Sequence, residues 1–103
     1  MKEIKAVIQT HQLDHVLSAL HHIGGLPSVM ISEGRLTNVD PGFYQTSPMT
    51  KVELMVPDSS VEAVVQAIQQ AAHTGADGDG RIYIIPIEDS VIIRTGERGE
   101  DAR

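Results

Sequence analysis

The chain contains no cysteine and no tryptophan, and its aromatic content is only 3% (Phe43, Tyr44 and Tyr83). Without cysteine it can form neither a disulfide nor a thiolate metal site, and it has no thiol nucleophile. A core with so few aromatic side chains must be aliphatic. The hydrophobic content of 41% in 103 residues is enough for one such core, so we expect a single domain.

Basic residues are also scarce. Eight Lys and Arg stand against 14 Asp and Glu, which gives a formal net charge of −6 at pH 7. This charge repels phosphate backbones and anionic lipids, so we expect neither nucleic acid nor a membrane surface as a partner. No apolar run is long enough for a signal peptide or for direct membrane insertion as a spanning helix. The sequence therefore predicts a cytoplasmic protein.

The spacing of apolar residues predicts alternating strands and helices. Alternation after Met1 is typical of a half-buried strand, and helical spacing after Leu13 indicates a helix that ends at Gly24. Ser59 and Glu62 have the spacing of a capping box and indicate the start of a second helix. The expected elements are strands over 2–9, 28–33, 51–56 and 81–85, helices over 12–23 and 61–72, and a short fifth strand that residues 91–93 could form.

Two strand-helix-strand units in one sheet give an α+β fold of the ferredoxin-like βαββαβ type, a sandwich in which both helices cover one face. The strands carry apolar residues on both sides, as Val7 beside Ile8 and Ile84 beside Ile85 show. Oligomerisation is an economical way to cover the second face, because an apolar patch of that size is rare on a monomer. The fold hosts many functions and selects none of them.

Residues 34–50 interrupt every periodic pattern. They contain two prolines, two glycines and several Thr, Ser and Asn residues, which predicts a long loop. A loop of this length in so small a domain is usually functional or mobile.

A glycine-rich segment follows the second helix. Gly75, Gly78 and Gly80 let the backbone turn sharply and come close to a ligand, and successive N–H groups in such a turn can bind an anion. Arg81 and Arg94 carry guanidinium groups suited to phosphate oxygens. The segment therefore indicates a phosphate-binding loop.

The residues alone leave a second interpretation open, in which Gly75 caps the helix and the two Asp-Gly pairs are simple turns. A Walker motif is excluded, because the segment follows a helix and lacks the Lys-Ser/Thr pair. A calcium loop of the EF-hand type is excluded too, since Asp77 and Asp79 have no third acidic ligand before the glycine.

Three segments resemble the PII signal-transduction family, the nitrogen regulatory protein P-II family. Residues 1–8 are similar to the opening of that family (MKEIKAVI), residues 73–84 to its glycine-rich B-loop (HTGADGDGRIYI), and residues 93–97 to the segment that closes the same site (IRTGE). The details look most like the PII-like branch that is often encoded beside transport systems.

This resemblance implies a non-enzymatic signalling protein with a PII-like domain over 1–97 and a charged C-terminal tail over 98–103. It implies a homotrimer that binds an adenine nucleotide (ADP, AMP or ATP) in the clefts between subunits. Residues 34–50 would be the T-loop, which regulates a protein partner such as a membrane transporter and contacts it through Phe43 and Tyr44. The nucleotide-binding residues that the resemblance implies are Met30, Arg35, Met55, Thr74, Gly75, Gly78, Asp79, Gly80, Arg81 and Arg94.

Three positions depart from the pattern of the family. Ile92 stands where the family has a second phosphate-binding arginine, Ala76 where the B-loop has a lysine, and Met49 where a T-loop lysine holds 2-oxoglutarate. Each lost charge-assisted hydrogen bond costs about 1.5–3 kcal/mol of binding free energy. We therefore expect a weak preference for ATP, comparable binding of ADP or AMP, and no 2-oxoglutarate site of the usual kind.

The histidines suggest an alternative function. His11, His15 and His22 would share the polar face of the first helix, and imidazole is a ligand for zinc, nickel and copper. A trimeric metal-binding protein resembling the divalent-cation tolerance family is thus the alternative. Metal sites usually need three or more converging ligands with outer-shell support, so we expect a solvated helix face and no metal.

Catalysis has little support in the sequence. Paired carboxylates and a nucleophile motif are both missing. An acylphosphatase-like enzyme would need a glycine-rich anion-binding loop after the first strand, and Gln9-Thr10-His11-Gln12 is not glycine-rich. We expect no enzymatic activity.

Overall fold

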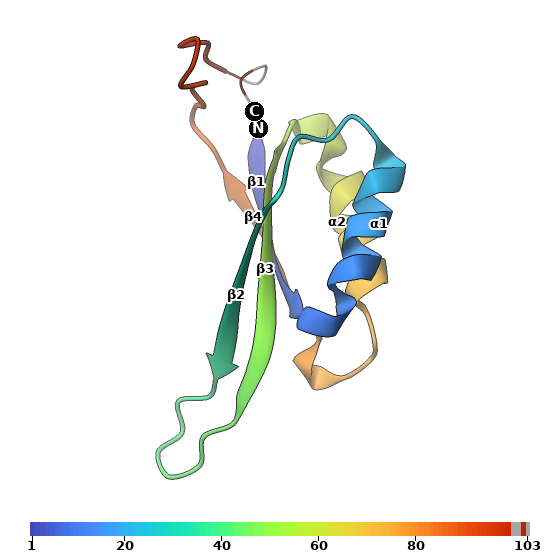
Figure 1. The fold of residues 1–103 in the computed structure, drawn as a ribbon, viewed down its shortest axis with the longest axis vertical. Coiled ribbons are helices and arrows are strands. Elements are labelled where there is room, and N and C mark those ends of the chain that lie inside the picture. Colours follow the sequence, from blue (N-terminus) through green and yellow to red (C-terminus); the bar gives the residue numbers. More distant parts are fainter. Residues whose placement is uncertain (100–101, 103) are drawn as a thin grey trace.

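The computed structural model describes residues 1–99 and residue 102. These residues form a four-stranded antiparallel sheet with the strand order β2-β3-β1-β4, and two helices cover one of its faces (Figure 1). The predicted ferredoxin-like βαββαβ fold is therefore confirmed. The elements are β1 (Lys2–Gln9), α1 (Leu13–Ile23), β2 (Met30–Thr37), β3 (Thr46–Val56), α2 (Val61–Ala72) and β4 (Gly80–Pro86).

An aliphatic core fills the space between the sheet and the helices. Alternate residues of β1 and β3 point to the helices and are buried, which agrees with the period of two in these strands. The core side chains are Ile4, Ala6, Ile8, Val16, Leu20, Val52, Leu54, Val56, Val64, Ile68 and Ala72.

No helix in the described part of the chain is long and apolar enough to cross a membrane.

The second face of the sheet is covered by none of the described elements (Figure 1). Tyr83, Lys5, Glu53 and Met30 lie in one row across its four strands. The face thus combines apolar and charged side chains, and charged groups of both signs lie close together on neighbouring strands.

The predicted loop over residues 34–50 is wrong at both ends. β2 and β3 pair continuously from Met30 opposite Glu53 to Thr37 opposite Thr46, so only residues 38–45 form a loop. The hydroxyl oxygens of Thr37 and Thr46 lie 2.9 Å apart where the pairing ends. This hairpin projects beyond the end of β1 and contributes to the longest dimension of the molecule, 50 Å against 28 and 19 Å (Figure 1).

Two smaller predictions are also wrong. The N-cap of α2 is Ser60, which makes no side-chain capping bond, so Ser59 and Glu62 do not form a capping box. Residues 91–93 do not form a strand; Val91 makes an isolated bridge with Arg98 instead. Arg98, the first residue of the predicted tail, is therefore paired with another segment of the chain.

The predicted tail is described only in part. Arg98 contacts Asp89, and Ala102 is buried and donates a hydrogen bond from its backbone N to the carbonyl oxygen of Gly99 (2.9 Å). The other tail residues, 100, 101 and 103, lie outside the described residues.

Candidate functional site

The glycine-rich segment between α2 and β4 closes on one of its own side chains. The carboxylate of Asp79 accepts hydrogen bonds from the backbone N of Thr74 (2.8 Å), from the backbone N of Gly75 (2.9 Å) and from the hydroxyl of Thr74. Residues Asp77–Asp79 form one turn of 3₁₀ helix. Gly75 supplies the positive φ of 92° that lets the chain turn back.

These hydrogen bonds lower the pKa of Asp79. The hydroxyl of Thr74 is the largest cause that lowers the pKa of Asp79, followed by the backbone N–H of Thr74, while partial burial acts in the opposite direction. The N–H of Gly75 and the nearby His73 lower the pKa further. Asp79 therefore stays ionised to lower pH than an unperturbed aspartate and remains an acceptor for its three donors.

Gly80 fixes the place where the loop enters the sheet. It has φ +104°, and a Cβ atom at this position would lie 1.8 Å from the carbonyl oxygen of Val7. Only glycine therefore allows β4 to begin this close to β1. Arg81 follows directly in β4, an edge strand of the sheet.

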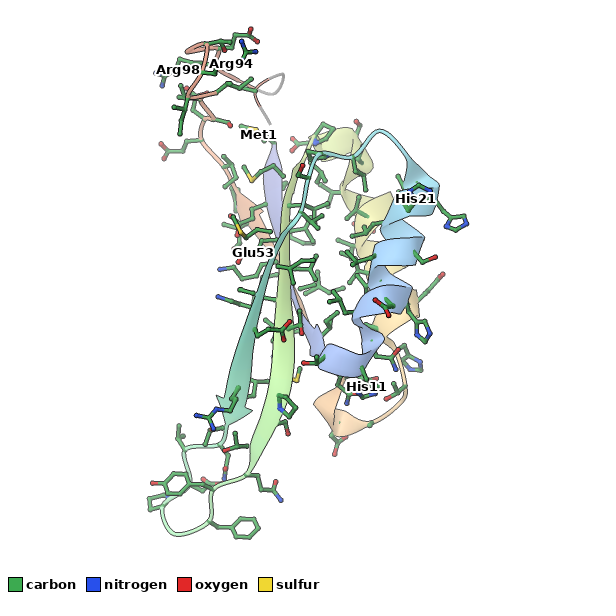
Figure 2. The ribbon with its side chains drawn as sticks, viewed as in Figure 1. Met1, His11, His21, Glu53, Arg94 and Arg98 are labelled. Carbon is green, nitrogen blue, oxygen red and sulfur yellow. The ribbon has the colours of Figure 1, made fainter. Side chains whose placement is uncertain are left out.

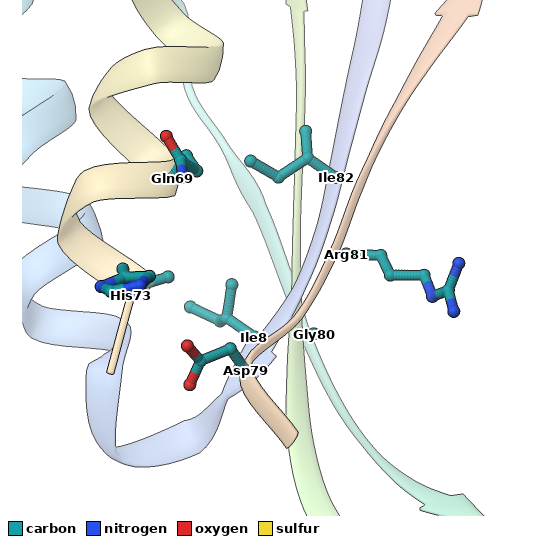
Figure 3. A pocket seen from close by; sticks show the side chains of 8 residues that line it. Ile8, Gln69, His73, Asp79, Gly80, Arg81 and Ile82 are labelled. Carbon is teal, nitrogen blue, oxygen red and sulfur yellow. The ribbon is translucent and has the colours of Figure 1, made fainter. Parts of the chain in front are cut away.

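Arg81 and Asp79 point to opposite sides of the sheet. Figure 3 shows the Asp79 carboxylate turned toward α2 and His73, while the guanidinium of Arg81 extends to the other side. Between α2 and β4 lies a hollow of about 330 Å³ whose lining includes Gln69, Asp79 and Arg81, although the Arg81 guanidinium extends away from it. A separate hollow of about 190 Å³ is lined by Val7, Leu36, Asp77, Gly78, Gly80, Arg81 and Tyr83.

Met30 and Met55, which we expect to contact the adenine, line a third hollow of about 360 Å³ together with Glu3 and Glu53. Met30 lies on β2, at the opposite edge of the sheet from β4. Three strand spacings, about 14 Å, separate these two edge strands. Within one chain the predicted adenine contacts and the glycine-rich segment are thus in different places.

Arg35 lies on the extended part of β2, opposite Pro48. Successive side chains of a strand alternate between its faces, and the neighbouring Leu36 lines the hollow beside Arg81. Arg35 therefore belongs to the other face of the hairpin, and the structure does not place it with Arg81.

Arg94 is at the opposite end of the molecule from the glycine-rich segment. Figure 2 shows it at the same end of the molecule as Arg98 and Met1, whereas Arg81 stands at the beginning of β4. The seven residues of β4 span about 20 Å, so the two guanidinium groups cannot meet on one phosphate within a single chain.

A clamp around Asp89 holds the segment that carries Arg94. Its carboxylate accepts hydrogen bonds from Arg98 Nε (2.8 Å) and from the backbone N of Ser90 and Gly99 (2.8 and 3.0 Å), and Arg98 Nη2 lies 2.7 Å from Oδ2. The Arg98 side chain is the largest cause that lowers the pKa of Asp89. This clamp was not predicted, because its only signal in the sequence is an acid and a base on either side of a turn.

The loop over residues 38–45 has an ordered tip. The side chain of Asn38 donates to the carbonyl oxygen of Phe43 (2.7 Å) and accepts from the backbone N of Gln45. Phe43 and Tyr44 are 66% and 65% exposed and extend from this tip. Asn38 was not predicted as a functional residue, although asparagine before an Asp-Pro-Gly turn is a typical signal for local side-chain hydrogen bonding.

Two of the histidines of α1, His15 and His22, make local hydrogen bonds. Nδ1 of His15 lies 2.7 Å from the side-chain oxygen of Gln12, and Nδ1 of His22 lies 2.7 Å from the carbonyl oxygen of Ser18. Among residues 1–99 and 102, no three or more His, Cys, Asp or Glu side chains are grouped so that they could hold a metal ion. His11 therefore has no partners for a three-ligand site with His15 and His22.

Comparisons with known proteins identify the family and agree with the fold. Residues 1–97 match the profile of the family described as "Nitrogen regulatory protein P-II". The proteins of that name from Azospirillum brasilense and Rhodospirillum rubrum are 41% and 42% identical over 112 aligned positions, which cover 99% of this chain and 99% of each relative. The solved structure of Arabidopsis thaliana PII bound to citrate has a TM-score of 0.86 and 34% identity, and the match covers 99% of this chain and 91% of that one. The chain belongs to the nitrogen regulatory protein P-II family.

Proposed function

We propose that this chain is a nucleotide-responsive regulator, a trimer that binds an adenine nucleotide between subunits and reports it to a protein partner. The P-II family consists of regulatory signalling proteins that are generally not enzymes. The matching Arabidopsis protein was solved with citrate, a small polyanion, bound to it. An anionic effector is therefore chemically reasonable for the family.

One observation carries the proposal: the predicted binding residues are divided between the two ends of one sheet. Arg81 and the glycine-rich segment occupy the end where β4 begins, and Arg94 lies at the other end (Figure 2). A site that uses both groups requires two chains, with one end of each subunit against the opposite end of its neighbour.

The uncovered face of the sheet supports association of subunits. Met30, Tyr83 and Val7 give it apolar surface, and Lys5 and Glu53 provide charges of opposite sign that a second copy could pair. A closed ring of three copies would have three equivalent clefts, one between each pair of neighbouring subunits.

In each cleft the phosphates would lie on Gly78, Gly80 and Arg81, with Thr74, Gly75 and Asp79 shaping the loop. The neighbouring chain would contribute Arg94 and the hollow beside Met30 and Met55 for the adenine, and Arg35 would approach from the base of the hairpin. Because Ile92, Ala76 and Met49 supply no positive charge, ADP or AMP should bind comparably to ATP, and 2-oxoglutarate should have no site of the usual kind.

The hairpin tip would make the contact with the partner. Phe43 and Tyr44 are exposed and held by Asn38, and the alignment of 112 positions exceeds the 103 residues of this chain by nine (112 − 103). We assign at least part of this shortening to the tip, since all four strands of the sheet are present. A membrane transporter is the proposed partner and the cytoplasm the proposed location, as in the transport-linked branch that the sequence resembles.

Calorimetric titration of the purified protein with ATP, ADP, AMP and cyclic AMP tests this function, together with the molar mass in solution. We expect a trimer that binds ATP and ADP with affinities within about a hundredfold of each other, a difference of 2.7 kcal/mol. Failure to bind any adenosine phosphate at millimolar concentration would remove the proposed function. Among residues 1–99 and 102, the histidines are not grouped with other possible ligands in a way that favours the metal-binding alternative.

A further inference from the structure

Asp79 carries a further inference because three donors converge on one carboxylate. Its Oδ2 accepts from the backbone N of Thr74 and of Gly75, and its Oδ1 accepts from the hydroxyl of Thr74. In addition, the backbone N of Asp79 donates to the carbonyl oxygen of Ala76 (3.3 Å). The segment over residues 74–79 is thus closed by its own side chain.

The direction of this carboxylate is equally informative. Figure 3 shows Asp79 turned toward α2, while Arg81, two residues later, extends to the opposite side of the strands. A free carboxylate on the Arg81 side would repel phosphate groups. The hydrogen bonds of Thr74 and Gly75 keep this negative charge on the other side of the sheet.

We propose that Asp79 is a positioning residue for phosphate binding, which acts through the shape of the loop and does not touch the nucleotide. The inference rests on the proposed function, since it assigns a role within the same site. It differs from the resemblance to the family, which places Asp79 among the residues that bind nucleotide. A positioning role predicts that shape matters at this position and that negative charge does not.

Two substitutions of Asp79 separate shape from charge. Asp79→Ala removes all three acceptor contacts. Asp79→Asn removes the charge but keeps the shape, because its oxygen can accept from both backbone N–H groups and its NH₂ can donate to the Thr74 hydroxyl. Thr74→Val and Thr74→Ser form a second pair. Thr74→Val removes the hydroxyl donor and leaves the backbone N–H in place, whereas Thr74→Ser keeps both.

The measurement is the Kd of ADP and ATP for each variant, by calorimetry with and without Mg²⁺. We expect Asp79→Ala to weaken binding about tenfold, equivalent to 1.4 kcal/mol, although it removes a negative charge near phosphate. Asp79→Asn should restore the affinity to within about threefold of the unchanged protein, a difference of less than 1 kcal/mol. Thr74→Val should weaken binding less than Asp79→Ala, and Thr74→Ser should restore it.

Asp77→Ala is the matched control. It removes the same charge from the same loop, but the Asp77 carboxylate makes no hydrogen bond to the described part of the chain. Because Asp77 lines the hollow beside Arg81, its removal should leave nucleotide binding unchanged or strengthen it. Equal affinities of Asp79→Ala and the unchanged protein would overturn the proposal. A second outcome would also overturn it: Asp79→Asn binds nucleotide as weakly as Asp79→Ala, but only when Mg²⁺ is present. Asp79 would then hold the metal ion of the nucleotide directly.

A second readout needs no nucleotide and keeps the inference distinct from the proposed function. Amide hydrogen exchange at Thr74 and Gly75, followed by NMR, should accelerate in Asp79→Ala and return toward the original rate in Asp79→Asn. Unchanged exchange in Asp79→Ala would refute the role of Asp79 in shaping the loop. If the exchange behaves as expected but no adenosine phosphate binds, the proposed function fails, and with it the link from loop shape to phosphate binding.

Discussion

The N-terminal nitrogen of Met1 lies 2.6 Å from Oδ1 of Asp58, and this pair joins the first residue of the chain to the turn that leads into α2. Lys2 Nζ lies 3.4 Å from the same oxygen. The hydrogen bond from the N-terminal ammonium is the largest cause that lowers the pKa of Asp58, and Lys2 adds to it. The pair therefore links the sheet layer to the helix layer through charge.

Asp58→Asn should make the protein less stable at neutral pH and should weaken its sensitivity to acid. The pKa of Asp58 is lower in the folded state, so the unfolded chain takes up the proton first as the pH falls. The stabilisation is complete above the ordinary Asp pKa, about 4, and is lost as the pH falls through the lower pKa of the folded state. Urea unfolding from pH 7 to roughly pH 2 measures this.

Asp77→Asn is the control for Asp58→Asn, since it changes the same charge at an exposed site. The stability difference between the unchanged protein and Asp58→Asn should shrink in acid, whereas the difference for Asp77→Asn should stay small throughout. A difference for Asp58→Asn that is the same at both ends of the pH range would show that the ion pair does not stabilise the fold.

Gly80→Ala should be much more destabilising than Gly75→Ala, although both glycines have positive φ. Gly75 has open space where a Cβ would stand, so its substitution costs only backbone strain of about 1–2 kcal/mol. At Gly80 the Cβ would overlap the carbonyl oxygen of Val7, and displacing β4 from β1 should bring the total to about 3 kcal/mol. The free energies of unfolding from urea titrations test this order, and equal losses for the two variants would contradict the described entry of the loop into the sheet.

The sequence predicts most elements of this fold because burial leaves a periodic signal. The alternation of Ile4, Ala6 and Ile8 and the helical spacing of Val64 and Ile68 are direct consequences of one face packing on the core. The extended hairpin leaves no such signal. Its residues are mostly exposed, β2 is an edge strand, and the pairing of Thr37 with Thr46 depends on backbone hydrogen bonds that any residue but proline can donate.

The candidate site was predictable in residue type but not in arrangement. Glycine spacing and the following arginine identify the phosphate-binding loop, but the sequence does not reveal that Asp79 and Arg81 point to opposite sides of the sheet. Nor does it place Arg94 at the far end from Arg81, because that separation follows from the direction of β4. The local hydrogen bonds of Asn38 and Asp89 were not predicted for a different reason: several possible partners lie near each residue in the sequence, and the sequence does not select one of them.

Asn38→Ala should loosen the hairpin tip without unfolding the domain. It removes the bond to the Phe43 carbonyl and the acceptor of the Gln45 N–H, both in an exposed loop far from the core. Limited digestion with chymotrypsin, which cuts after aromatic residues, should become several-fold faster at Phe43 and Tyr44, while the urea midpoint changes little. Asp40→Ala removes only a longer contact of 3.4 Å to Asn38 and serves as the control. Equal digestion rates for Asn38→Ala and the unchanged protein would show that Asn38 does not hold the tip.

Mixing subunits tests whether the nucleotide site is shared between chains. Arg81→Ala and Arg94→Ala should each weaken ATP binding about tenfold or more as pure proteins, because each removes one guanidinium from every cleft. If a cleft combines Arg81 of one chain with Arg94 of the next, a trimer that contains both variants has some clefts with both arginines intact.

Co-refolding the two variants in equal amounts should therefore restore tight binding in about one quarter of the clefts, those in which an Arg94→Ala chain supplies the loop and an Arg81→Ala chain supplies Arg94. The stoichiometry of the tight phase in calorimetry measures this fraction. The control is a mixture of the unrefolded homotrimers, which should show no tight phase. If both arginines instead came from one chain, every cleft of the mixed trimers would lack one guanidinium and no tight phase would appear. That outcome would contradict the shared site, because the length of β4 separates Arg81 from Arg94 within one chain.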